Sequence, residues 1–257
     1  INLKPIIIIP ARFGSKRYKG KPLVKILGRE MVLRVADICA KVSGKKNLYV
    51  ATDNRKISKV VKNAGYKTIM TSKKCLTGTD RVAEAALKIK SKIFINVQGD
   101  EPTINPNDIK KIIQVKLKNK DHVVCGYDKL QKFDDPKNIN LPKVVMNEKK
   151  ELIYISRAVI PGSKRFNKNE IYYKQVCIYA FSRDELKMFY KKKRKSSLEK
   201  KEDIEILRFF DLNKKIKMVQ LNSNSIAVDE ISDVKKAEKL LKKKYEKIYR
   251  YKFKKQI

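Results

Sequence analysis

A short, uninterrupted apolar run near the start of the chain constrains the fold more than any other feature. Four isoleucines, Ile6 to Ile9, stand between Pro5 and Pro10. A β-strand that is covered on both faces reads as a continuous apolar segment, whereas a strand with one wet face alternates apolar and polar residues. We therefore expect residues 5–10 to form an interior strand of a parallel sheet.

Strand-like and helix-like segments then alternate through the first hundred residues. Further strands are expected at 47–51, 66–70 and 92–97, and helices with apolar residues at helical spacing at 31–42, 57–63 and 80–89. This alternation is typical of βαβ units with right-handed crossovers. It predicts an α/β fold with a mainly parallel sheet flanked by helices.

The pattern changes after residue 120. Strand-like segments follow one another without full helices between them, at 123–127, 143–146, 152–156 and 174–181. They predict a mixed or antiparallel extension of the sheet. The remaining expected elements are a helix at 202–210, a short strand at 217–221 and a long basic helix at 232–251. We expect one domain over residues 1–257, in which 123–180 is a smaller strand-rich lobe.

The chain is strongly basic. It has 63 Lys and Arg against 27 Asp and Glu, a net charge of +36, which suggests a nucleic-acid-binding protein. The excess is mostly lysine and is spread over nearly every segment, whereas arginine is the residue favoured for bidentate phosphate and base contacts. Ordinary solvated faces are the favoured interpretation, and nucleic-acid binding stays open as the alternative. The same field would attract an anionic small substrate.

Cysteine, histidine and apolar runs exclude other classes. The four cysteines are widely spaced and His122 is the single histidine, so neither a zinc site nor a disulfide framework is predicted, and buried reduced thiols are expected. His122 is expected at the surface. No segment approaches the about 20 apolar residues that a membrane span needs, and no signal-peptide pattern opens the chain. We expect a cytoplasmic protein.

Two polar loops that follow strands carry the candidate chemistry. Residues 10–23 hold five cations and two glycines where open α/β sheets bind ligands, and backbone amides beside glycine can approach an anion. This segment matches neither the Walker A pattern nor G-x-G-x-x-G. We expect it to bind phosphate.

The second loop, residues 96–102, follows another apolar strand. Gly99 permits an unusual backbone angle, so that Asp100 can project over the sheet edge. A carboxylate there can hold Mg²⁺ against a triphosphate. Residues 51–53 and 77–81 carry Thr and Asp at a strand end or a helix start, where these residues serve first as caps. Their position at the same expected edge favours ligand contact as well.

Six motifs, in order, resemble those of the 3-deoxy-manno-octulosonate (Kdo) cytidylyltransferase family. They are P-A-R-x-x-S-x-R at 10–17, G-K-P-L at 20–23, A-T-D at 51–53, T-G-T-D-R at 77–81, N-V-Q-G-D-E-P at 96–102 and S-R-A-x-I-P at 156–161. The resemblance runs from residue 5 to about residue 240. It implies a Rossmann-like nucleotidyltransferase fold, and an enzyme that joins CTP and Kdo into CMP-Kdo and pyrophosphate for lipopolysaccharide or capsule biosynthesis. It also implies a homodimer that meets through about 123–180.

The resemblance assigns residues to each part of the site. The implied phosphate ligands are Arg12, Ser15, Arg17 and Lys21, and the implied cytidine neighbours are Thr77, Gly78, Thr79 and Gln98. The implied Mg²⁺ ligands are Asp100 and Asp229, which with Arg12 and Lys21 would carry catalysis. The implied sugar contacts are Gln98, Arg157, Gln175, Tyr179 and Glu205.

Two positions depart from the family's pattern. Gln175 stands where the family usually has histidine, and Ile206 interrupts the sequence E-Q-L-R. Both are expected in the sugar-facing half, where the loss of one polar contact can change selectivity by orders of magnitude. A cytidylyltransferase for a related acid, 8-amino-Kdo or a nonulosonic acid, is therefore the alternative activity.

Overall fold

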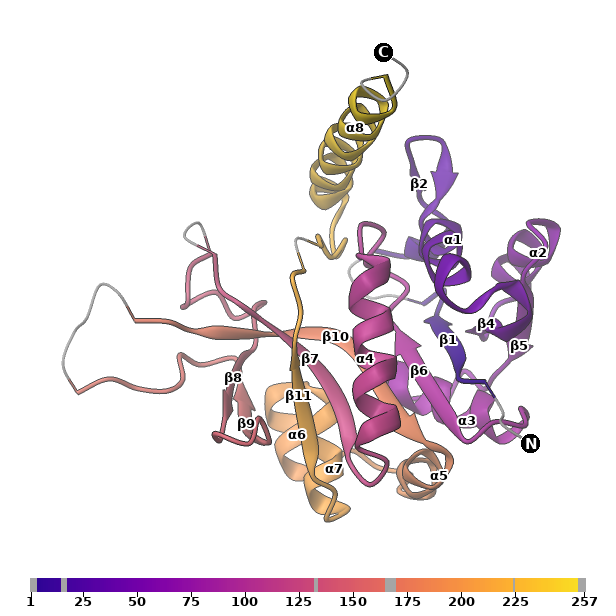
Figure 1. Ribbon diagram of the computed structural model, residues 1–257. Coiled ribbons are helices and arrows are strands. Elements are labelled where there is room, and N and C mark those ends of the chain that lie inside the picture. The colour runs from indigo at the N-terminus through magenta and orange to yellow at the C-terminus, as the bar shows by residue number, and fades with distance from the viewer. Residues whose placement is uncertain (1–3, 15–17, 132–133, 165–169, 224, 254–257) are drawn as a thin grey trace.

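A mixed β-sheet with helices on both faces forms the centre of the molecule (Figure 1). The computed structural model describes residues 4–14, 18–131, 134–164, 170–223 and 225–253. The main path of the sheet runs in the order β11-β7-β10-β6-β1-β4-β5, and β8 and β9 extend it from β10. Its strands are β1 (Ile6–Ala11), β4 (Leu48–Thr52), β5 (Lys67–Met70), β6 (Ile93–Val97), β7 (Val123–Lys129), β8 (Lys143–Met146), β9 (Leu152–Ser156), β10 (Tyr173–Ser182) and β11 (Ile216–Gln220).

The expected βαβ half of the fold is confirmed. β1 pairs in parallel with β4 and β6, and β4 pairs in parallel with β5. Ile7, Ile8 and Ile9 are all fully buried, because successive strand residues point to opposite faces and both faces are covered. Ile8 packs in one core cluster with α3 (Gly78–Leu87), and its two neighbours pack in another with α1 (Met31–Ser43).

The other helices divide between the same two faces. α2 (Arg55–Asn63) and α4 (Pro106–Lys118) bury residues on the α1 side, whereas α5 (Arg183–Lys191) and α7 (Arg208–Asp211) bury residues on the α3 side. The expected mixed extension is also present. β10 runs antiparallel between β6 and β7, β11 pairs in parallel with β7, and β8 and β9 form an antiparallel pair beside β10.

The prediction of one helix over 202–210 is wrong, because the helical conformation is interrupted there. α6 (Ser197–Glu202) ends at Asp203, which has a positive φ of 50°, and Ile204 is extended. A short 3-10 turn, Glu205–Leu207, then leads into α7. Three helices, α4, α5 and α6, were not expected although each carries a start signal, which in α6 is the capping box of Ser196 and Glu199. Pro106 follows the cap Asn105 in α4, and Ser182 with Glu185 forms a capping box in α5.

The long C-terminal helix docks near the loop that follows β1. Figure 1 shows α8 (Ile231–Phe253) standing out beyond the sheet, close to the hairpin of β2 (Lys25–Ile26) and β3 (Arg29–Glu30). Its residues Ala237 and Leu241 pack with Ile26. In the part of the chain that the structure describes, no helix is both long and apolar enough to cross a bilayer.

Candidate functional site

One lysine and two aspartates meet at the carboxyl edge of the parallel strands. Lys21 Nζ lies 2.9 Å from Asp100 Oδ2 and 3.3 Å from Asp229 Oδ1. The Val228 amide donates a hydrogen bond of 2.9 Å to the Asp100 carbonyl and so joins the two acidic segments. The Asp100 and Asp229 side chains keep 32% and 35% of their exposure. Two carboxylates thus converge on one cation at a position open to solvent.

Two glycines make this convergence possible. A Cβ atom at Gly99 would lie 2.9 Å from the Pro10 carbonyl oxygen, so only glycine lets the loop after β6 approach the end of β1 this closely. Gly20 has a φ of 74° and precedes the 3-10 turn Lys21–Leu23. The turn carries Lys21 back across the sheet edge to Asp100.

The carboxylate pair fits a hard divalent cation. Its donors are oxygens, and the structure already places a positive group, Lys21 Nζ, between them. Among the described residues no cluster of three or more His, Cys, Asp or Glu is arranged for a metal. Mg²⁺ in nucleotide enzymes usually takes one or two carboxylates and completes its octahedral shell with water and substrate phosphates.

A second group of predicted residues meets at the first turn of α3. Thr77 caps the helix: its Oγ1 accepts from the Asp80 amide at 3.2 Å and donates to Asp80 Oδ2 at 2.6 Å. The Thr79 amide donates to Glu205 Oε2 at 2.9 Å, and Gln98 Nε2 donates to Glu205 Oε1 at 3.0 Å. Glu205 therefore joins the α3 turn to the end of β6, and burial raises the pKa of its carboxyl group.

Gly78 and Asn96 complete this group. A Cβ atom at Gly78 would lie 3.0 Å from the Gln98 amide oxygen, so the turn and that side chain are in close contact. Asn96 Nδ2 donates to Thr79 Oγ1 at 3.2 Å, whereas Asn96 Oδ1 is buried without a partner among the described residues. We did not single out Asn96 from the sequence, although its place in the 96–102 motif was a signal.

Of the five residues predicted to contact the sugar, Gln98 and Glu205 lie at the α3 turn, and the other three lie in two further places. Gln175 and Tyr179 are on β10, where Gln175 Nε2 donates to Tyr179 Oη at 3.1 Å, and Tyr179 pairs across the strands with Asn96. Arg157 follows β9. Its guanidinium donates to the backbone carbonyls of Glu202 at 2.5 Å, Ile139 at 2.7 Å and Asp203 at 3.2 Å.

Ile206, expected in the sugar-facing half, lies in the same core cluster as the predicted sugar residue Tyr179. Its side chain is fully buried in the core on the α3 side, together with Leu207 and Phe209. The 3-10 turn directs Glu205 toward Thr79 and the next residue toward the sheet.

The first cationic loop is described in part. Arg12 is exposed after β1, and Ser15 and Arg17 lie outside the described residues. The pKa of Asp203 is lowered, first by its hydrogen bond from Lys195 and then by the charges of Arg157 and Arg12. Arg12 and Arg157, predicted for the phosphates and for the sugar acid, thus act on the same carboxylate.

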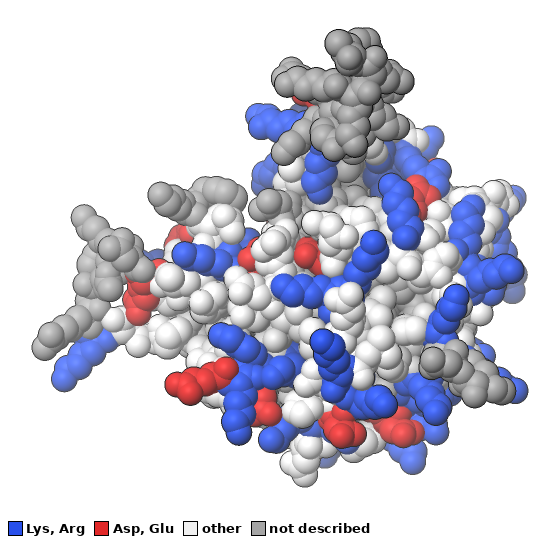
Figure 2. Space-filling view, in the orientation of Figure 1, with Lys and Arg blue, Asp and Glu red and all other residues white. Residues whose placement is uncertain are grey.

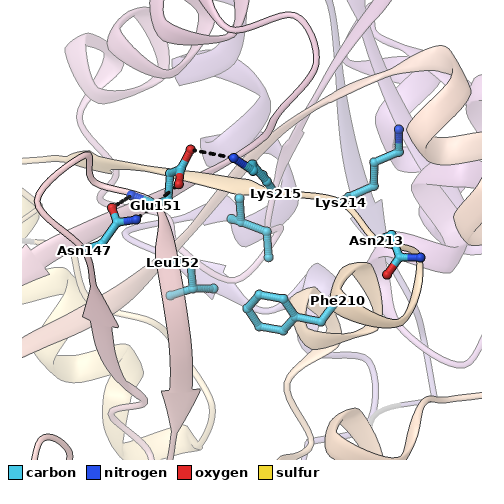
Figure 3. Close-up of a pocket in the computed structure, with 8 residues that line it drawn as sticks. Asn147, Glu151, Leu152, Phe210, Asn213, Lys214 and Lys215 are labelled. Atoms are coloured by element: carbon cyan, nitrogen blue, oxygen red, sulfur yellow. Dashed lines mark hydrogen bonds and ion pairs between the residues drawn. The ribbon is translucent and has the colours of Figure 1, made fainter.

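His122 and a surface hollow lie at the opposite edge of the sheet. The hollow, of about 350 Å³, is lined by Asn147, Glu151, Leu152, Phe210, Asn213, Lys214, Lys215 and Ile216 (Figure 3). The hollow borders the amino end of β11. His122 directly precedes β7, and its Nε2 lies 3.3 Å from Glu151 Oε1. None of the predicted site residues lines it.

All four cysteines are free thiols, and burial raises the pKa of Cys125 to about 12.

Positive charge is spread over the visible face. Figure 2 shows Lys and Arg side chains scattered over that whole face, with Asp and Glu among them, and no single basic stripe. A groove lined by clustered cations is the usual footprint of nucleic-acid binding. The distribution on this face favours the interpretation that the lysines cover ordinary solvated surface.

Glu101 joins the segment that carries Asp100 to the segment that carries Asp229. It is buried, and Ser225 Oγ donates to its Oε2 at 2.8 Å. Burial raises the pKa of Glu101 from 4.5 to about 7, and the charges of Asp100 and Asp108 act in the same direction. The residue belongs to the 96–102 motif, but its part in joining residues 225–229 to the β6 end was not expected.

Comparison with known proteins places this geometry among nucleotidyltransferases. A family model described as Cytidylyltransferase matches residues 6–216. The 3-deoxy-manno-octulosonate cytidylyltransferase of Escherichia coli is 34% identical over 241 residues, which cover 93% of this chain and 96% of that protein. The 8-amino-3,8-dideoxy-manno-octulosonate cytidylyltransferase of Shewanella oneidensis is 35% identical and covers 91% of this chain and 97% of that protein.

Solved structures agree with the sequence relatives. A CMP:2-keto-3-deoxy-manno-octonic acid synthetase complexed with CTP superposes with a TM-score of 0.86 and 32% identity, covering 94% of this chain and 99% of the other. The inositol-1-phosphate CTP transferase of T. maritima, with a TM-score of 0.65, 17% identity and coverage of 93% and 97%, shares the fold alone. The expected Rossmann-like nucleotidyltransferase fold is confirmed.

The buried Glu101 predicts how stability changes with pH. Its folded-state pKa of about 7 exceeds the ordinary 4.5, so between these values the folded chain holds a proton that the unfolded chain has released. The free energy of unfolding should therefore fall as pH rises through this window, by up to about 3 kcal/mol relative to Glu101→Gln. Urea unfolding at steps from about pH 4.5 to 8 measures the difference. Exposed Glu148→Gln is the matched control, and a constant difference between wild type and Glu101→Gln would contradict the prediction.

Proposed function

The chain belongs to the cytidylyltransferase family and is a nucleotidyltransferase, and we propose that it transfers CMP from CTP to 3-deoxy-manno-octulosonate. The observation that carries this proposal is the convergence of Asp100, Asp229 and Lys21 beside the loop that follows β1. The relatives that cover more than nine-tenths of this chain support the choice of nucleotide and of an octulosonate as acceptor.

The proposed reaction is an in-line displacement at phosphorus. The anomeric hydroxyl oxygen of the sugar acid forms a bond to the α-phosphorus of CTP. The bond from that phosphorus to the oxygen that bridges to the β-phosphate breaks, so pyrophosphate leaves with this oxygen, and the hydroxyl proton passes to water. Such a displacement asks the protein mainly for positioning and for charge neutralisation. A histidine base is not part of the proposal.

We assign Mg²⁺ binding to Asp100 and Asp229. When bound, the ion supplies positive charge that lowers the pKa of the attacking hydroxyl and screens the phosphates. The two carboxylates would hold this charge at the sheet edge, where Lys21 pairs with both of them in the structure. The Lys21 ammonium sits on a flexible four-carbon stem, which lets it pair with the phosphates of CTP instead. With Arg12, it would balance the charge that develops on pyrophosphate.

The remaining residues divide between nucleotide and sugar. Ser15 and Arg17 are proposed to bind the phosphates with Arg12, and the turn Thr77 to Thr79 with Gln98 to surround the cytidine. Three N–H groups of Arg157 are used by backbone carbonyls. A guanidinium has five, so two remain for the carboxylate of the sugar acid. Gln175, Tyr179 and Glu205 complete the proposed sugar side, with Gln98 next to both substrates.

The setting of the reaction follows from the same proposal. An activated octulosonate would serve lipopolysaccharide or capsule biosynthesis in the cytoplasm.

We also propose a homodimer that meets through the strand-rich segment 123–180. Ile139, Ile153 and Ile171 of this segment are 65%, 58% and 49% exposed, and a contact with a second chain would cover such apolar side chains.

Loss of one metal carboxylate should abolish turnover. Asp100→Asn or Asp229→Asn keeps the side-chain shape but removes charge from the pair, so Mg²⁺-dependent pyrophosphate release from CTP and Kdo should fall by at least about 100-fold. A coupled pyrophosphate assay measures this. Asp121→Asn, at an exposed position, should leave the rate unchanged. Near-normal turnover of the Asp100 variant would reject the metal assignment.

Residue 175 should influence which acid is used. Gln175→His restores the side chain usual in the family at a position that contacts Tyr179. We expect the ratio of kcat/KM for Kdo to that for 8-amino-Kdo to change by about tenfold, because one polar contact in a pocket separates close analogues. The exposed Gln114→His on α4 is the control. An unchanged ranking across a panel of acids removes this role.

The dimer proposal predicts a change of mass. Ile153→Glu places a charge on the proposed contact, so sedimentation equilibrium should show the mass fall from twice the 29.9 kDa chain to a single chain. Leu117→Glu changes an equally apolar exposed residue on α4 and should leave the dimer intact. A monomeric wild type, or a dimer in Ile153→Glu, overturns the proposed interface.

A further inference from the structure

Arg208 lies fully buried beneath the first turn of α3 and has no part in the proposed chemistry. It follows the 3-10 turn that begins at Glu205, whose carboxylate accepts from Thr79 and Gln98. The segment 205–208 therefore reaches the α3 turn at both of its ends. Glu205 touches the turn directly, and Arg208 touches it through Asp80.

The guanidinium of Arg208 holds two carboxylates at once. Nη1 and Nη2 lie 2.7 and 3.1 Å from the two oxygens of Asp80. Nε and Nη2 lie 2.6 Å from the two oxygens of Glu199, and the group stacks 3.9 Å from the centre of the Phe189 ring. Paired N–H donors on a planar group fix the orientation of a carboxylate as well as its distance.

Asp80 passes this orientation on to the predicted nucleotide residues. The oxygen that faces Nη2 of Arg208 also accepts the hydroxyl hydrogen of Thr77 at 2.6 Å, and the Asp80 amide donates back to Thr77 Oγ1. Gly78, between these residues, lies against the Gln98 amide. A rotation of the Asp80 carboxylate would therefore turn Thr77 and shift the backbone that faces Gln98.

Stability alone does not explain this buried cluster. Taking one guanidinium and two carboxylates out of water carries a large desolvation cost, and apolar side chains of similar volume often give an equally stable core. A fully satisfied buried polar network instead selects a single arrangement of its members. The arrangement selected here is that of the turn at residues 77–79 relative to the end of β6.

We propose that Arg208 is a positioning residue for the nucleotide: through Asp80 it holds residues 77–79 against Gln98 in the geometry that accepts the cytidine of CTP. This inference rests on the proposed function, because it takes that turn as the cytidine site. Arg208 itself touches no substrate. Its effect should appear in the affinity for CTP rather than in the affinity for the sugar acid.

The chain contains a closely matched control. Glu185 is the third residue of α5, as Asp80 is of α3, and each exchanges hydrogen bonds with the residue that caps its helix. Glu185 pairs with the fully buried Lys116 at 2.8 Å. Because α5 begins where β10 ends, this pair lies at the sheet edge opposite to the site.

The experiment compares Asp80→Asn and Arg208→Lys with Glu185→Gln. Each change weakens a buried ion pair, so all three should lower the midpoint of thermal unfolding. In the pyrophosphate assay, KM for CTP should rise roughly tenfold in the first two variants, as expected for a lost charged hydrogen bond in the supporting network. KM for the sugar acid should stay within about twofold of wild type, and Glu185→Gln should keep both values. The preference for CTP over UTP should fall only in the Asp80 and Arg208 variants.

The outcomes separate this inference from the proposed function. A wild-type chain that releases no pyrophosphate from CTP with any sugar acid overturns the proposed function and, with it, the inference. Normal wild-type turnover with an unchanged KM for CTP in Asp80→Asn and Arg208→Lys overturns the inference alone. The same holds if Glu185→Gln raises KM for CTP as much as they do. Arg208→Lys keeps the charge, so it serves where Asp80→Asn does not fold.

Discussion

The ion-pair group of Lys21, Asp100 and Asp229 joins three remote parts of the chain at one point. Two carboxylates this close repel each other unless a cation lies between them, and in this structure Lys21 supplies that charge. The loop after β1, the loop after β6 and the start of α8 are thereby held in register before any ligand arrives. The fold thus positions both carboxylates, and in the proposed reaction Lys21 exchanges them for the phosphates of CTP.

Local pattern predicted the parallel half of the fold well. The isoleucines of β1 have both faces covered, and the strand, helix and strand that follow lie within a few residues of where their spacing placed them. Tertiary contacts decided the rest. The positive φ of Asp203 interrupts the helix expected at 202–210, and Arg208 there binds Glu199 and Asp80 from other segments; the spacing of apolar residues reports neither feature. The motif at 96–102 indicated Asp100, and the family resemblance indicated Asp229. The bonds of Arg157 to three backbone carbonyls follow only from the folded loop.

Glu205 changes the expected division of the site into two halves. It was assigned to the sugar, yet both of its oxygens bind groups expected beside the cytidine, the Thr79 amide and the Gln98 side chain. Burial raises the pKa of this carboxyl group, and its hydrogen bonds from Thr79 act in the opposite direction. Glu205 therefore joins a residue proposed for the nucleotide, Thr79, to Gln98, which is proposed to lie next to both substrates.

The docking of α8 links the position of Asp229 to the position of this helix. Asp229 stands just before this helix. The bond from the Leu27 amide to Glu238 attaches the helix to the hairpin that follows Lys21, and the bond from Arg34 to Tyr245 attaches it to α1. A ligand that draws Asp229 toward Asp100 therefore also favours the attached helix. If the proposed Mg²⁺ binds Asp229, thermodynamic reciprocity requires that a change which loosens the helix from the hairpin weakens the binding of that ion by the same factor. The docking of α8 on the hairpin would in this way influence the proposed ion binding at the sheet edge.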